Sequence, residues 1–433
     1  MGRPEPPPAR PQRRRITTAG AVFTILLLAL LCYTRYSEKL LSVVPTIMTQ
    51  DTQPQFHASL TKPTLLASLP PSALPKPHGG PKSPRLIIIG DVHGQLSALD
   101  ALLAKVGYSG ARGDVVIFTG DMVNKGPDSG GVVDRAVEMG AYSVRGNHED
   151  RVLRAWDEMQ AKGSMDTDSE TETETDVAEE AEGDVETEKK KHKHKHKHHK
   201  GKKEARKTAK SLTSAQRSWL AARPVILRVG AVSPYYGDVV VVHGGLVPGI
   251  PLEKQDPQVV MNIRTLITPS SSTSFSPESL VSDNDSLDSS ADSFSHSHLK
   301  PSEGREGHPW SKVWNALEKE KQKKNSKKGG RHGTPEPPTT VVYGHDAKTG
   351  LSVRRYAFGI DSNCARGGEL TALVFEPTSA SAAMSNPSDT NTNINTNKDE
   401  DEDDSELAAA RHGIKHRLVS VSCRAQRIGG RHV

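Results

Sequence analysis

Cysteine is scarce in this sequence, which contains only Cys32, Cys364 and Cys423 among its 433 residues. Three cysteines spread over the chain are too few for a disulfide scaffold or for a cysteine-based zinc site. We expect Cys364 and Cys423 to be buried free thiols, the alternative being that they pair in an oxidising compartment. Any bound metal ion must therefore be held by His, Asp or Asn side chains.

Apolar residues are also few. Hydrophobic residues make up 34% of the chain and aromatic residues 4%, which is low for a globular protein, so much of the chain cannot bury a core. Charge of one sign does not dominate, because 57 Lys and Arg residues nearly cancel 52 Asp and Glu residues and leave a net charge of +5. These charges lie in separate blocks, so the net charge is a poor guide to partners, and we expect no specific nucleic-acid partner.

A long apolar run is present near the N-terminus, within a predicted transmembrane segment at residues 17–34. The run is shorter than the ~20 residues that span a bilayer comfortably. No small-x-small cleavage site follows it, so we interpret it as an uncleaved signal anchor rather than a cleaved signal peptide. Arginines cluster in the basic tail before it, residues 1–16. The positive-inside rule then predicts a single-pass type II membrane protein whose remaining residues face a lumen.

Composition divides the rest of the chain into ordered and low-complexity parts. Residues 35–84 are rich in Pro, Ser and Lys and are predicted to form a stalk. One domain is predicted over residues 85–425, followed by a tail at residues 426–433. Low-complexity inserts are expected to interrupt this domain at residues 164–210, 269–338 and 377–410.

The first of these inserts contains a block of Lys and His at residues 189–200, directly after a stretch rich in Asp, Glu and Thr. Its charge density suits nucleic acid, a metal ion or a polyanion. The simpler interpretation is a solvated low-complexity segment, and we favour it.

Apolar patterns predict alternating strands and helices in the first part of the domain. Leu86–Ile89 has the pattern of a strand buried on both faces, and apolar residues then recur at helical spacing over residues 96–106. Further strands are predicted at residues 115–118 and 142–144, with a helix between them. This alternation predicts an α/β fold whose chemistry lies on the loops that leave the strand ends. Later strands are predicted at residues 239–242, 341–343, 356–360, 370–375 and 418–421, with an island at 308–315 docked by its two tryptophans.

Residues with metal-binding side chains follow these predicted strands. Asp91 and His93 lie in a Gly-Asp-Val-His-Gly sequence after the first strand, Asp121 follows the second and Asn147 the third. A single Asp-x-His turn is weak evidence, but three successive strands that deliver Asp, Asp and Asn at the same end are hard to explain as packing. Two later strands are followed in the same way by His243 and His345.

The order and spacing of these motifs resemble those of the calcineurin-like metallophosphoesterases, in the branch shared by Ser/Thr protein phosphatases and bacterial dinucleoside-tetraphosphate hydrolases. Within this branch, residues 308–315, 342–351, 359–364 and 370–373 are most similar to the fungal zinc-dependent endopolyphosphatases of the vacuolar membrane. The resemblance covers the ordered parts and not the charged inserts. It implies a central β-sandwich flanked by helices and a location at the vacuole membrane.

The resemblance also implies a site for two divalent metal ions, which could be Zn, Mn, Co or Fe, with zinc favoured. Two such cations polarise phosphoryl oxygens and stabilise an in-line displacement. The implied ligands are Asp91 and His93 for one ion, Asp121 as a bridge between the two, and Asn147, His243 and His345 for the second.

Three further roles follow from the resemblance. His148 would protonate the leaving oxygen, and Lys125 and Arg264, with Arg145 as a weaker candidate, would bind phosphate. Protein phosphatases have Asp-Arg where this chain has Asn124-Lys125. Asn124 is expected to accept a hydrogen bond from His148 without supplying charge, and lysine offers a point charge in place of a bidentate fork. Both differences weaken the expectation of a phosphoprotein substrate.

Three functions remain open at this point. The first is hydrolysis of phosphoanhydride bonds in inorganic polyphosphate by an endopolyphosphatase. The second, within the same chemistry, is a Ser/Thr protein phosphatase or a dinucleoside-polyphosphate hydrolase. The third, from another class, is an inactive membrane-anchored scaffold that binds polyanions, and the complete set of six implied ligands argues against it.

Overall fold

The computed structural model describes residues 62–80, 82–161, 200–267, 299–328, 336–378 and 411–424, together with Gly2 and Ala409. The chain divides into two units, Met1–His57 and Ala58–Val433. The predicted basic tail (apart from Gly2), transmembrane segment and C-terminal tail lie outside the described residues, as does the block of Lys and His except for its last residue. Over the ranges given above, no helix is long and apolar enough to cross a membrane.

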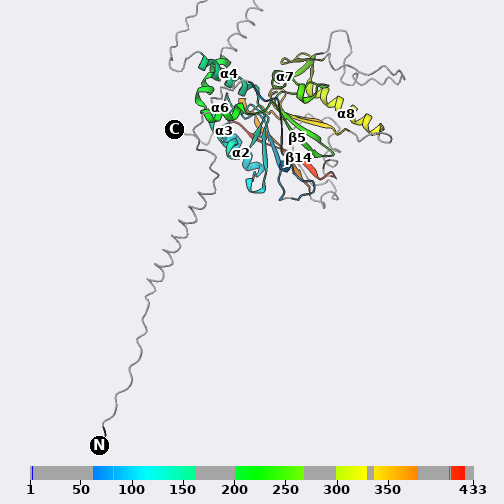
Figure 1. Cartoon of the computed structure of the whole chain (residues 1–433), viewed down its shortest axis with the longest axis horizontal. Helices are drawn as coiled ribbons and strands as arrows, with labels where there is room; N and C mark the ends of the chain where they lie inside the picture. The colour runs from blue at the N-terminus through cyan, green and yellow to red at the C-terminus, as the bar shows by residue number, and fades with distance from the viewer. Residues whose placement is uncertain are drawn as a thin grey trace, which may run out of the picture. The chain divides into compact units, whose positions relative to one another are not determined.

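Two β-sheets pack face to face in the second unit (Figure 1), and a core of apolar side chains from both sheets lies between them. Ile88 and Leu373 come from one sheet, and Val241 and Phe358 from the other. The expected α/β fold with a central β-sandwich is thereby confirmed. The six-stranded sheet has the order β1 (Leu66–Ser68), β5 (Ile226–Ser233), β6 (Gly237–Val242), β10 (Thr339–Tyr343), β12 (Ala357–Gly359) and β11 (Ser352–Arg354). The five-stranded sheet has the order β14 (Ile414–Ser422), β13 (Glu369–Pro377), β2 (Leu86–Ile89), β3 (Val115–Phe118) and β4 (Tyr142–Ser143).

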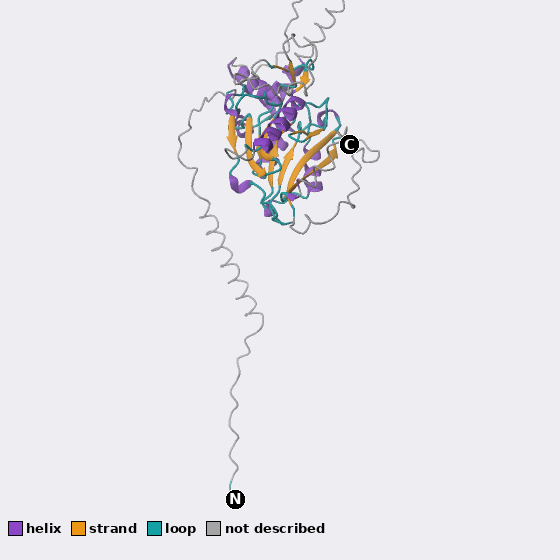
Figure 2. Cartoon of the chain, turned by 90° about the vertical axis from the view of Figure 1, so that its right-hand side faces the viewer, coloured by secondary structure: helices purple, strands orange, loops and turns teal. Residues whose placement is uncertain are grey.

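Helices cover the outer face of each sheet, as Figures 1 and 2 show. Strand β2 explains the arrangement, because its side chains alternate: Leu86 and Ile88 face the other sheet, whereas Ile87 and Ile89 face the helices. All four are fully buried, as the unbroken apolar run predicted. The five-stranded sheet is covered by α2 (Leu96–Val106), α3 (Ser129–Glu138), α4 (Asn147–Ala161) and α6 (Ser214–Ala221), and the six-stranded sheet by α7 (Pro257–Asn262) and α8 (Trp310–Lys328).

Parallel pairing in both sheets determines where the loops meet. Strands β2, β3 and β4 are parallel neighbours in one sheet, and β6, β10 and β12 are parallel neighbours in the other. The carboxyl ends of three strands therefore share one edge in each sheet. The loops that leave these ends are where functional side chains are expected in such folds.

The predicted stalk contains ordered residues, so its boundary at residue 84 is wrong. Strand β1 pairs in parallel with β5, with Leu66 opposite Ile226. A three-residue strand with the sequence Leu-Ala-Ser carries too little pattern to be recognised in a segment rich in proline.

Two predicted inserts also contain folded parts. Residues 200–211 form a helix, and Ala205 and Ala209 on it are fully buried in the core. In the second insert, β8 (Lys300–Ser302) and β9 (His308–Pro309) pair on either side of β7 (Thr265–Ile267), which directly precedes the insert, and α8 follows β9. Trp310 is buried there, as expected of the predicted island. The exposed faces of these helices carry many basic side chains, so the composition of both segments is polar and their apolar faces were not recognised from it.

Cys364 and Cys423 form a disulfide bond, so the expectation that both are free thiols is wrong. Cys364 opens the short helix η6 (Cys364–Arg366), and Cys423 directly follows β14. The bond therefore ties the end of the last strand to the loop that follows β12.

Candidate metal centre

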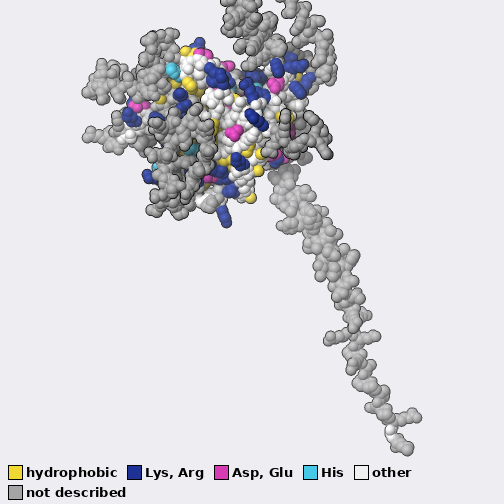
Figure 3. Space-filling view, turned by 180° about the vertical axis from the view of Figure 1, so that it is seen from behind, with side chains coloured by type: hydrophobic (Ala, Val, Ile, Leu, Met, Phe, Trp, Pro, Cys, Tyr) yellow, Lys and Arg dark blue, Asp and Glu magenta, His cyan; other side chains and the backbone are white. Residues whose placement is uncertain are grey.

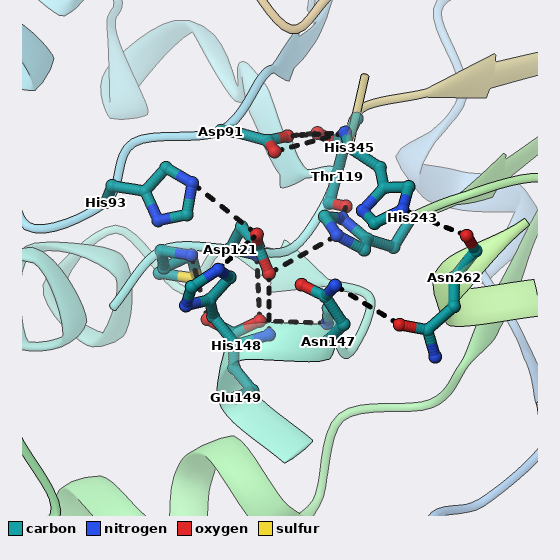
Figure 4. A network of polar contacts seen from close by, with 12 residues as sticks. Asp91, His93, Thr119, Asp121, Asn147, His148, Glu149, His243, Asn262 and His345 are labelled. Carbon is teal, nitrogen blue, oxygen red and sulfur yellow. Dashed lines mark hydrogen bonds and ion pairs between the residues drawn. The ribbon is translucent and has the colours of Figure 1, made fainter. Parts of the chain in front are cut away.

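The structure brings all six predicted metal ligands to the shared edge of the two sheets (Figure 4). Each comes from a segment that leaves one of the parallel strands. Asp91 and His93 follow β2, Asp121 follows β3, Asn147 begins α4 after β4, His243 follows β6, and His345 follows β10.

Asp121 lies at the centre of this group. Its Oδ1 is 3.3 Å from Nε2 of His243, and its Oδ2 is 3.5 Å from Nε2 of His93 and 3.8 Å from Nε2 of His148. Two sets of possible ligand atoms each lie within 4.8 Å of one another, one formed by His93, Asp121 and His148 and the other by Asp91, Asp121 and His243. Asp121 belongs to both sets, which is the position that a bridging carboxylate requires.

Two buried polar atoms indicate that metal ions fit here. His243 donates from Nδ1 to the backbone oxygen of Thr119 at 2.8 Å, while its buried Nε2 makes no hydrogen bond among the described residues and lies 3.3 Å from Oδ1 of Asp121. Asn147 donates from Nδ2 to Oδ1 of Asn262 at 3.2 Å, and its Oδ1 is likewise buried without a partner in the described part of the chain. A buried polar atom without a hydrogen bond is destabilising, and a bound cation, which would displace any proton on Nε2 of His243, would satisfy both atoms.

The electrostatics of the group favour the same conclusion. Burial and repulsion from Asp361 raise the pKa of Asp91 well above its usual value. Burial lowers the pKa of His243, but attraction to Asp121 outweighs this effect and raises that pKa to about 10. Metal ions would take the place of these protons, because metal ligands bind in their deprotonated forms. Two divalent cations held here would supply Lewis acidity that polarises a phosphoryl oxygen and acidifies an attacking water.

The backbone of the site is held in a rarely populated conformation. His93, Asp121, Asn124, Lys125 and His345 have φ values of 49, 49, 72, 70 and 70°, which are left-handed for residues other than glycine. Such conformations cost about 1–3 kcal/mol each and persist only where the surroundings enforce them. Their concentration at the ends of three strands indicates that the fold positions these side chains at some expense of stability.

Glu149 enforces part of this conformation. Its carboxylate accepts hydrogen bonds from the backbone N–H groups of Asp121, Met122 and Gly146 at 2.8 Å each, and from Val123 at 3.2 Å. It therefore holds the turn that presents Asp121. Glu149 was not among the residues predicted from the sequence, although it lies in the same Asn-His-Glu sequence as two predicted site residues.

His148 lies beside the metal ligands, with Nε2 of its ring toward Asp121 and Nδ1 in contact with Asn124. Asn124 donates from Nδ2 to Nδ1 of His148 at 2.9 Å, and Thr208 donates from Oγ1 to Oδ1 of Asn124 at 3.0 Å. The expectation that Asn124 accepts a hydrogen bond from His148 is therefore wrong, because the hydroxyl of Thr208 occupies the amide oxygen. Burial also lowers the pKa of His148 well below its usual value.

The predicted phosphate-binding residues divide into two groups. Lys125 and Arg264 line a cavity of about 440 Å³ that is also lined by five of the six predicted metal ligands, all except His243. Arg145 does not line it: the side chain is fully buried and donates to Oδ1 of Asp150 at 3.3 Å and to the backbone oxygen of Ala221 at 3.2 Å. The assignment of Arg145 to phosphate binding is wrong, because its side chain turns toward α4 and α6 and fixes these helices.

The cavity contains further charged residues that sequence analysis missed. Asp361 follows β12, the third parallel strand of its sheet, and is buried beside Asp91. Arg305 comes from the loop between β8 and β9, within a predicted insert. Lys348 and Arg366 come from turns after β10 and β12.

Comparison with known proteins gives the family of the chain. The model of the calcineurin-like phosphoesterase family matches residues 84–348, which is more than half of the 433-residue chain. A symmetrical bis(5'-nucleosyl)-tetraphosphatase from Acidovorax sp. is 42% identical over 73 residues, which cover 16% of this chain and 25% of that protein. The asymmetrical bis(5'-nucleosyl)-tetraphosphatase PrpE from Oceanobacillus iheyensis is 36% identical over 81 residues, 16% of this chain and 32% of its own length.

These matches to curated relatives therefore span about a quarter to a third of the relatives' length. Among solved structures, a protein serine/threonine phosphatase from Saccharomyces cerevisiae is 12% identical, with a TM-score of 0.33 and coverage of 73% of this chain and 77% of its own. The family match includes Asp91, Asp121 and Asn147 together with their strands. The chain belongs to the calcineurin-like phosphoesterase family.

Proposed function

We propose that this protein hydrolyses phosphoanhydride bonds with two divalent metal ions and that its substrate is inorganic polyphosphate, cut within the chain. The observation that carries the choice of substrate is the contact between Asn124 and His148. An amide N–H donates to Nδ1 of His148, so the ring carries its proton on Nε2, the nitrogen that faces Asp121.

This contact limits how much proton donation the site can supply. A carboxylate at position 124 would accept a hydrogen bond from Nδ1 and stabilise a doubly protonated ring. The Asn124 amide does the opposite, because its donor occupies the nitrogen that the second proton needs. The leaving group of a phosphoanhydride is a phosphate, which is much less basic than a serine alkoxide and requires less proton transfer in the transition state. Such a substrate suits this histidine.

The charge of the cavity supports a polyanionic substrate. Lys125 and Arg264 line it next to the metal ligands. Nζ of Lys125 is 3.0 Å from Nε2 of His93, so its ammonium group lies within reach of a phosphoryl oxygen held at the metal centre. Arg264 donates from Nη1 to the backbone oxygen of Glu303 at 2.9 Å, which fixes the guanidinium group at the wall of the cavity.

A time course on long-chain polyphosphate tests the proposal. We expect the purified protein, supplied with Zn²⁺, Co²⁺ or Mn²⁺, to convert long chains to intermediate lengths before orthophosphate accumulates, as seen on a gel. The Asp121→Asn variant is the inactive control. Long chains that stay intact while phosphoserine peptides are hydrolysed efficiently would refute the substrate assignment.

A second candidate is hydrolysis of dinucleoside polyphosphates, and the names of the two curated relatives described above favour it. The reaction also breaks a phosphoanhydride bond, so the Asn124–His148 contact is compatible with it. Diadenosine tetraphosphate belongs in the same assay, where a higher kcat/KM than for polyphosphate would favour this candidate. The inactive scaffold is disfavoured, because all six predicted ligands and His148 are brought together.

Zinc is the metal that we propose, on the resemblance to zinc-dependent endopolyphosphatases. The ligand set consists of nitrogen and oxygen atoms and also suits Mn, Fe or Co. Metal analysis of protein purified without added metal tests the choice, and a preparation that contains Mn or Fe in place of zinc would contradict it.

We also propose that residues 17–34 anchor the protein in the vacuole membrane with the catalytic domain in the lumen. The disulfide between Cys364 and Cys423 supports a location outside the cytosol, because disulfides persist mainly in oxidising compartments. The protein should stay with the membrane during carbonate extraction, and its catalytic domain should resist protease added outside intact vesicles. Digestion of that domain in intact vesicles would contradict the proposed topology and place the domain on the cytosolic side.

A further inference from the structure

We propose that Lys348 and Arg366 form a second phosphate-binding site at the mouth of the catalytic cavity, which takes the neighbouring phosphoryl units of a linear phosphate chain. The inference rests on the proposed function and extends it, because it names the part of the protein that distinguishes a chain of phosphates from a single phosphoryl group. Both side chains line the same cavity as the metal ligands.

The two cations are available to a ligand. Lys348 and Arg366 are exposed, and neither side chain has a hydrogen bond or an ion pair with another residue in the part of the chain that the structure describes. Arg305, a third cation at the cavity, differs from them, because its guanidinium group binds both carboxylate oxygens of Asp346. Arg305 and Asp346 neutralise each other, whereas Lys348 and Arg366 keep their positive charge.

The backbone around Lys348 is fixed. It lies three residues after His345, in a turn where the N–H groups of Thr349 and Gly350 donate to the backbone oxygen of Asp346 at 2.9 and 3.0 Å. The hydroxyl of Thr349 donates to Oδ2 of Asp346 at 2.6 Å. The turn therefore presents the lysine from a defined position beside a metal ligand.

The backbone around Arg366 is fixed by a covalent bond. Cys364 in the same helical turn is joined to Cys423, and the N–H of Cys423 donates to the backbone oxygen of Gly368 at 2.8 Å. Two rigid turns from different strands thus place two free cations on one cavity. Preorganised donors bind a ligand more tightly, since little backbone entropy is lost on binding.

The size and charge of the cavity agree with an extended anion. Its volume of about 440 Å³ lies in the range of pockets that hold a complete small ligand, which is more than one phosphoryl group at the metal centre requires. Glu303 is an exposed acid on the same cavity and opposes anion binding. Asp361, buried beside Asp91, is a second acid of this lining that is not a proposed metal ligand. Arg264, Lys348 and Arg366 outnumber these two acids, and each internal phosphoryl unit of polyphosphate carries one negative charge.

Kinetics of the Lys348→Ala/Arg366→Ala double variant test the proposal. The KM for long-chain polyphosphate should rise about tenfold, the combined effect of two exposed charge contacts. The KM for p-nitrophenyl phosphate should rise much less, because a single phosphoryl group does not reach the mouth of the cavity. The effect on polyphosphate should also shrink at high salt, where exposed charges are screened.

A second double variant controls for the loss of charge, because Lys and Arg side chains are spread over the surface, as on the face shown in Figure 3. Lys76 and Arg411 are exposed and adjoin the contact between His78 and Gly413, at the start of β14. The start of β14 pairs with the end of β13, and the end of β13 lies beside the start of β2. Asp91 and His93 follow the other end of β2. Lys76 and Arg411 therefore lie at the end of the sheet that is opposite the metal ligands. Lys76→Ala/Arg411→Ala removes the same charge from that end.

The possible outcomes separate this proposal from the proposed function. An equal rise in KM for both substrates, or the same rise in the Lys76→Ala/Arg411→Ala control, would overturn the second site. Failure of the unaltered protein to cut polyphosphate would overturn the substrate assignment. Inhibition of p-nitrophenyl phosphate hydrolysis by tripolyphosphate would then still test the second site, because its inhibition constant should rise about tenfold in the Lys348→Ala/Arg366→Ala variant. A larger loss of affinity for diadenosine tetraphosphate than for tripolyphosphate would assign the site to nucleotides instead.

Discussion

Asn124 donates a hydrogen bond to Nδ1 of His148 at 2.9 Å and thereby sets which ring nitrogen carries the proton. The contact is itself held by Thr208, whose hydroxyl donates to the amide oxygen of Asn124 at 3.0 Å. Two side chains from different elements, Asn124 and Thr208, thus determine the orientation and tautomer of a histidine beside the metal ligands. Substitution of residues that hydrogen-bond to the side chains of a metal site typically lowers metal affinity or activity by about 10- to 100-fold.

The Asn124→Asp variant should shift the substrate preference toward phosphomonoesters. A carboxylate accepts a hydrogen bond from Nδ1 and favours the doubly protonated ring, which donates a proton more readily to a basic leaving group. We expect the ratio of kcat/KM for a phosphoserine peptide to kcat/KM for polyphosphate to rise about tenfold. The ratio is obtained from parallel assays on one preparation, and an unchanged ratio would mean that this contact does not select the leaving group.

Thr208→Val should lower kcat about tenfold with little change in KM, because the amide of Asn124 loses the donor that fixes its direction. Thr208→Ser keeps the hydroxyl and should restore most of the activity. Both variants leave the metal ligands in place, so their metal content should equal that of the unaltered protein. A serine variant as slow as the valine variant would show that packing of the methyl group, and not the hydrogen bond, is what matters.

The sequence predicted the strands that precede the six ligands because each signal was local, and the resemblance to a known family then implied the ligand set. An unbroken apolar run such as Leu86–Ile89 can be recognised as a buried strand, and a Gly-Asp sequence after it marks the turn that carries Asp91. The two sheets could not be distinguished from this information, because strand order depends on contacts between distant segments. The resemblance to a known family supplied the β-sandwich.

The corrections share a physical cause, which is that they depend on side-chain direction or on contacts far apart in the sequence. Arg145 is near the metal ligands in sequence, yet its side chain binds Asp150 instead of the cavity. Thr208 lies in a segment dominated by basic residues, and only folding brings it to Asn124, 84 residues earlier. The cysteines that pair are 59 residues apart, and no spacing rule connects them.

Asp121→Asn should remove most of the bound metal and nearly all turnover, because Asp121 belongs to both groups of possible ligands. The neutral amide also withdraws the charge that His93 and His243 face. Metal content is measured by elemental analysis after gel filtration. Full metal content in this variant would rule out Asp121 as the bridge.

His148→Asn should behave differently from Asp121→Asn. All six proposed ligands remain, so metal content should persist while kcat falls by about 10²–10⁴, the range for the loss of a group that transfers a proton. The phosphoanhydride substrate should show the lower end of this range, because its leaving group needs less assistance. Loss of metal in this variant would make His148 a ligand, as its place in one of the two ligand groups also permits.

Cys423→Ser should lower the free energy of unfolding by about 2–5 kcal/mol, the usual effect of removing a native disulfide. It also frees the turn that carries Arg366, so the KM for polyphosphate should rise. Urea denaturation with and without a reducing agent measures the first effect, and the unaltered protein under reduction should match the variant. A variant as stable as the oxidised protein would show that the bond does not form in solution.

Acid should destabilise the domain between about pH 6.5 and pH 4 through His416. Burial and the positive charge of Arg355 lower the pKa of His416 from 6.5 to about 4, and its Nδ1 lies 2.7 Å from the hydroxyl of Tyr236. In this pH range the unfolded chain binds a proton that the folded protein does not bind, so stability falls as the pH falls. The loss reaches at most about 3 kcal/mol.

Asp114 provides an internal comparison, because its titration affects stability in a different pH range. Burial raises the pKa of Asp114, but hydrogen bonds from Arg112 and Arg85 outweigh this effect and lower it to about 2. A carboxyl group with a lowered pKa stabilises the fold above its unfolded pKa of 3.8 and loses this contribution only as the pH falls toward 2. Losses above pH 4 therefore do not come from Asp114.

The His416→Gln variant separates the histidine from the other groups. Glutamine retains an oxygen that can accept the hydroxyl hydrogen bond of Tyr236 and does not titrate, so it removes the proton uptake while keeping a polar partner. Urea midpoints at pH 7 and pH 4.5, both above the range in which Asp114 matters, give the loss of stability for each protein. We expect the loss of stability in the variant to be smaller by about 2 kcal/mol. Between the unfolded pKa of 6.5 and pH 4.5 the pH falls by two units, and each unit changes the free energy of unfolding by at most about 1.4 kcal/mol. Equal losses in the two proteins would show that His416 binds its proton as readily in the folded state as in the unfolded chain.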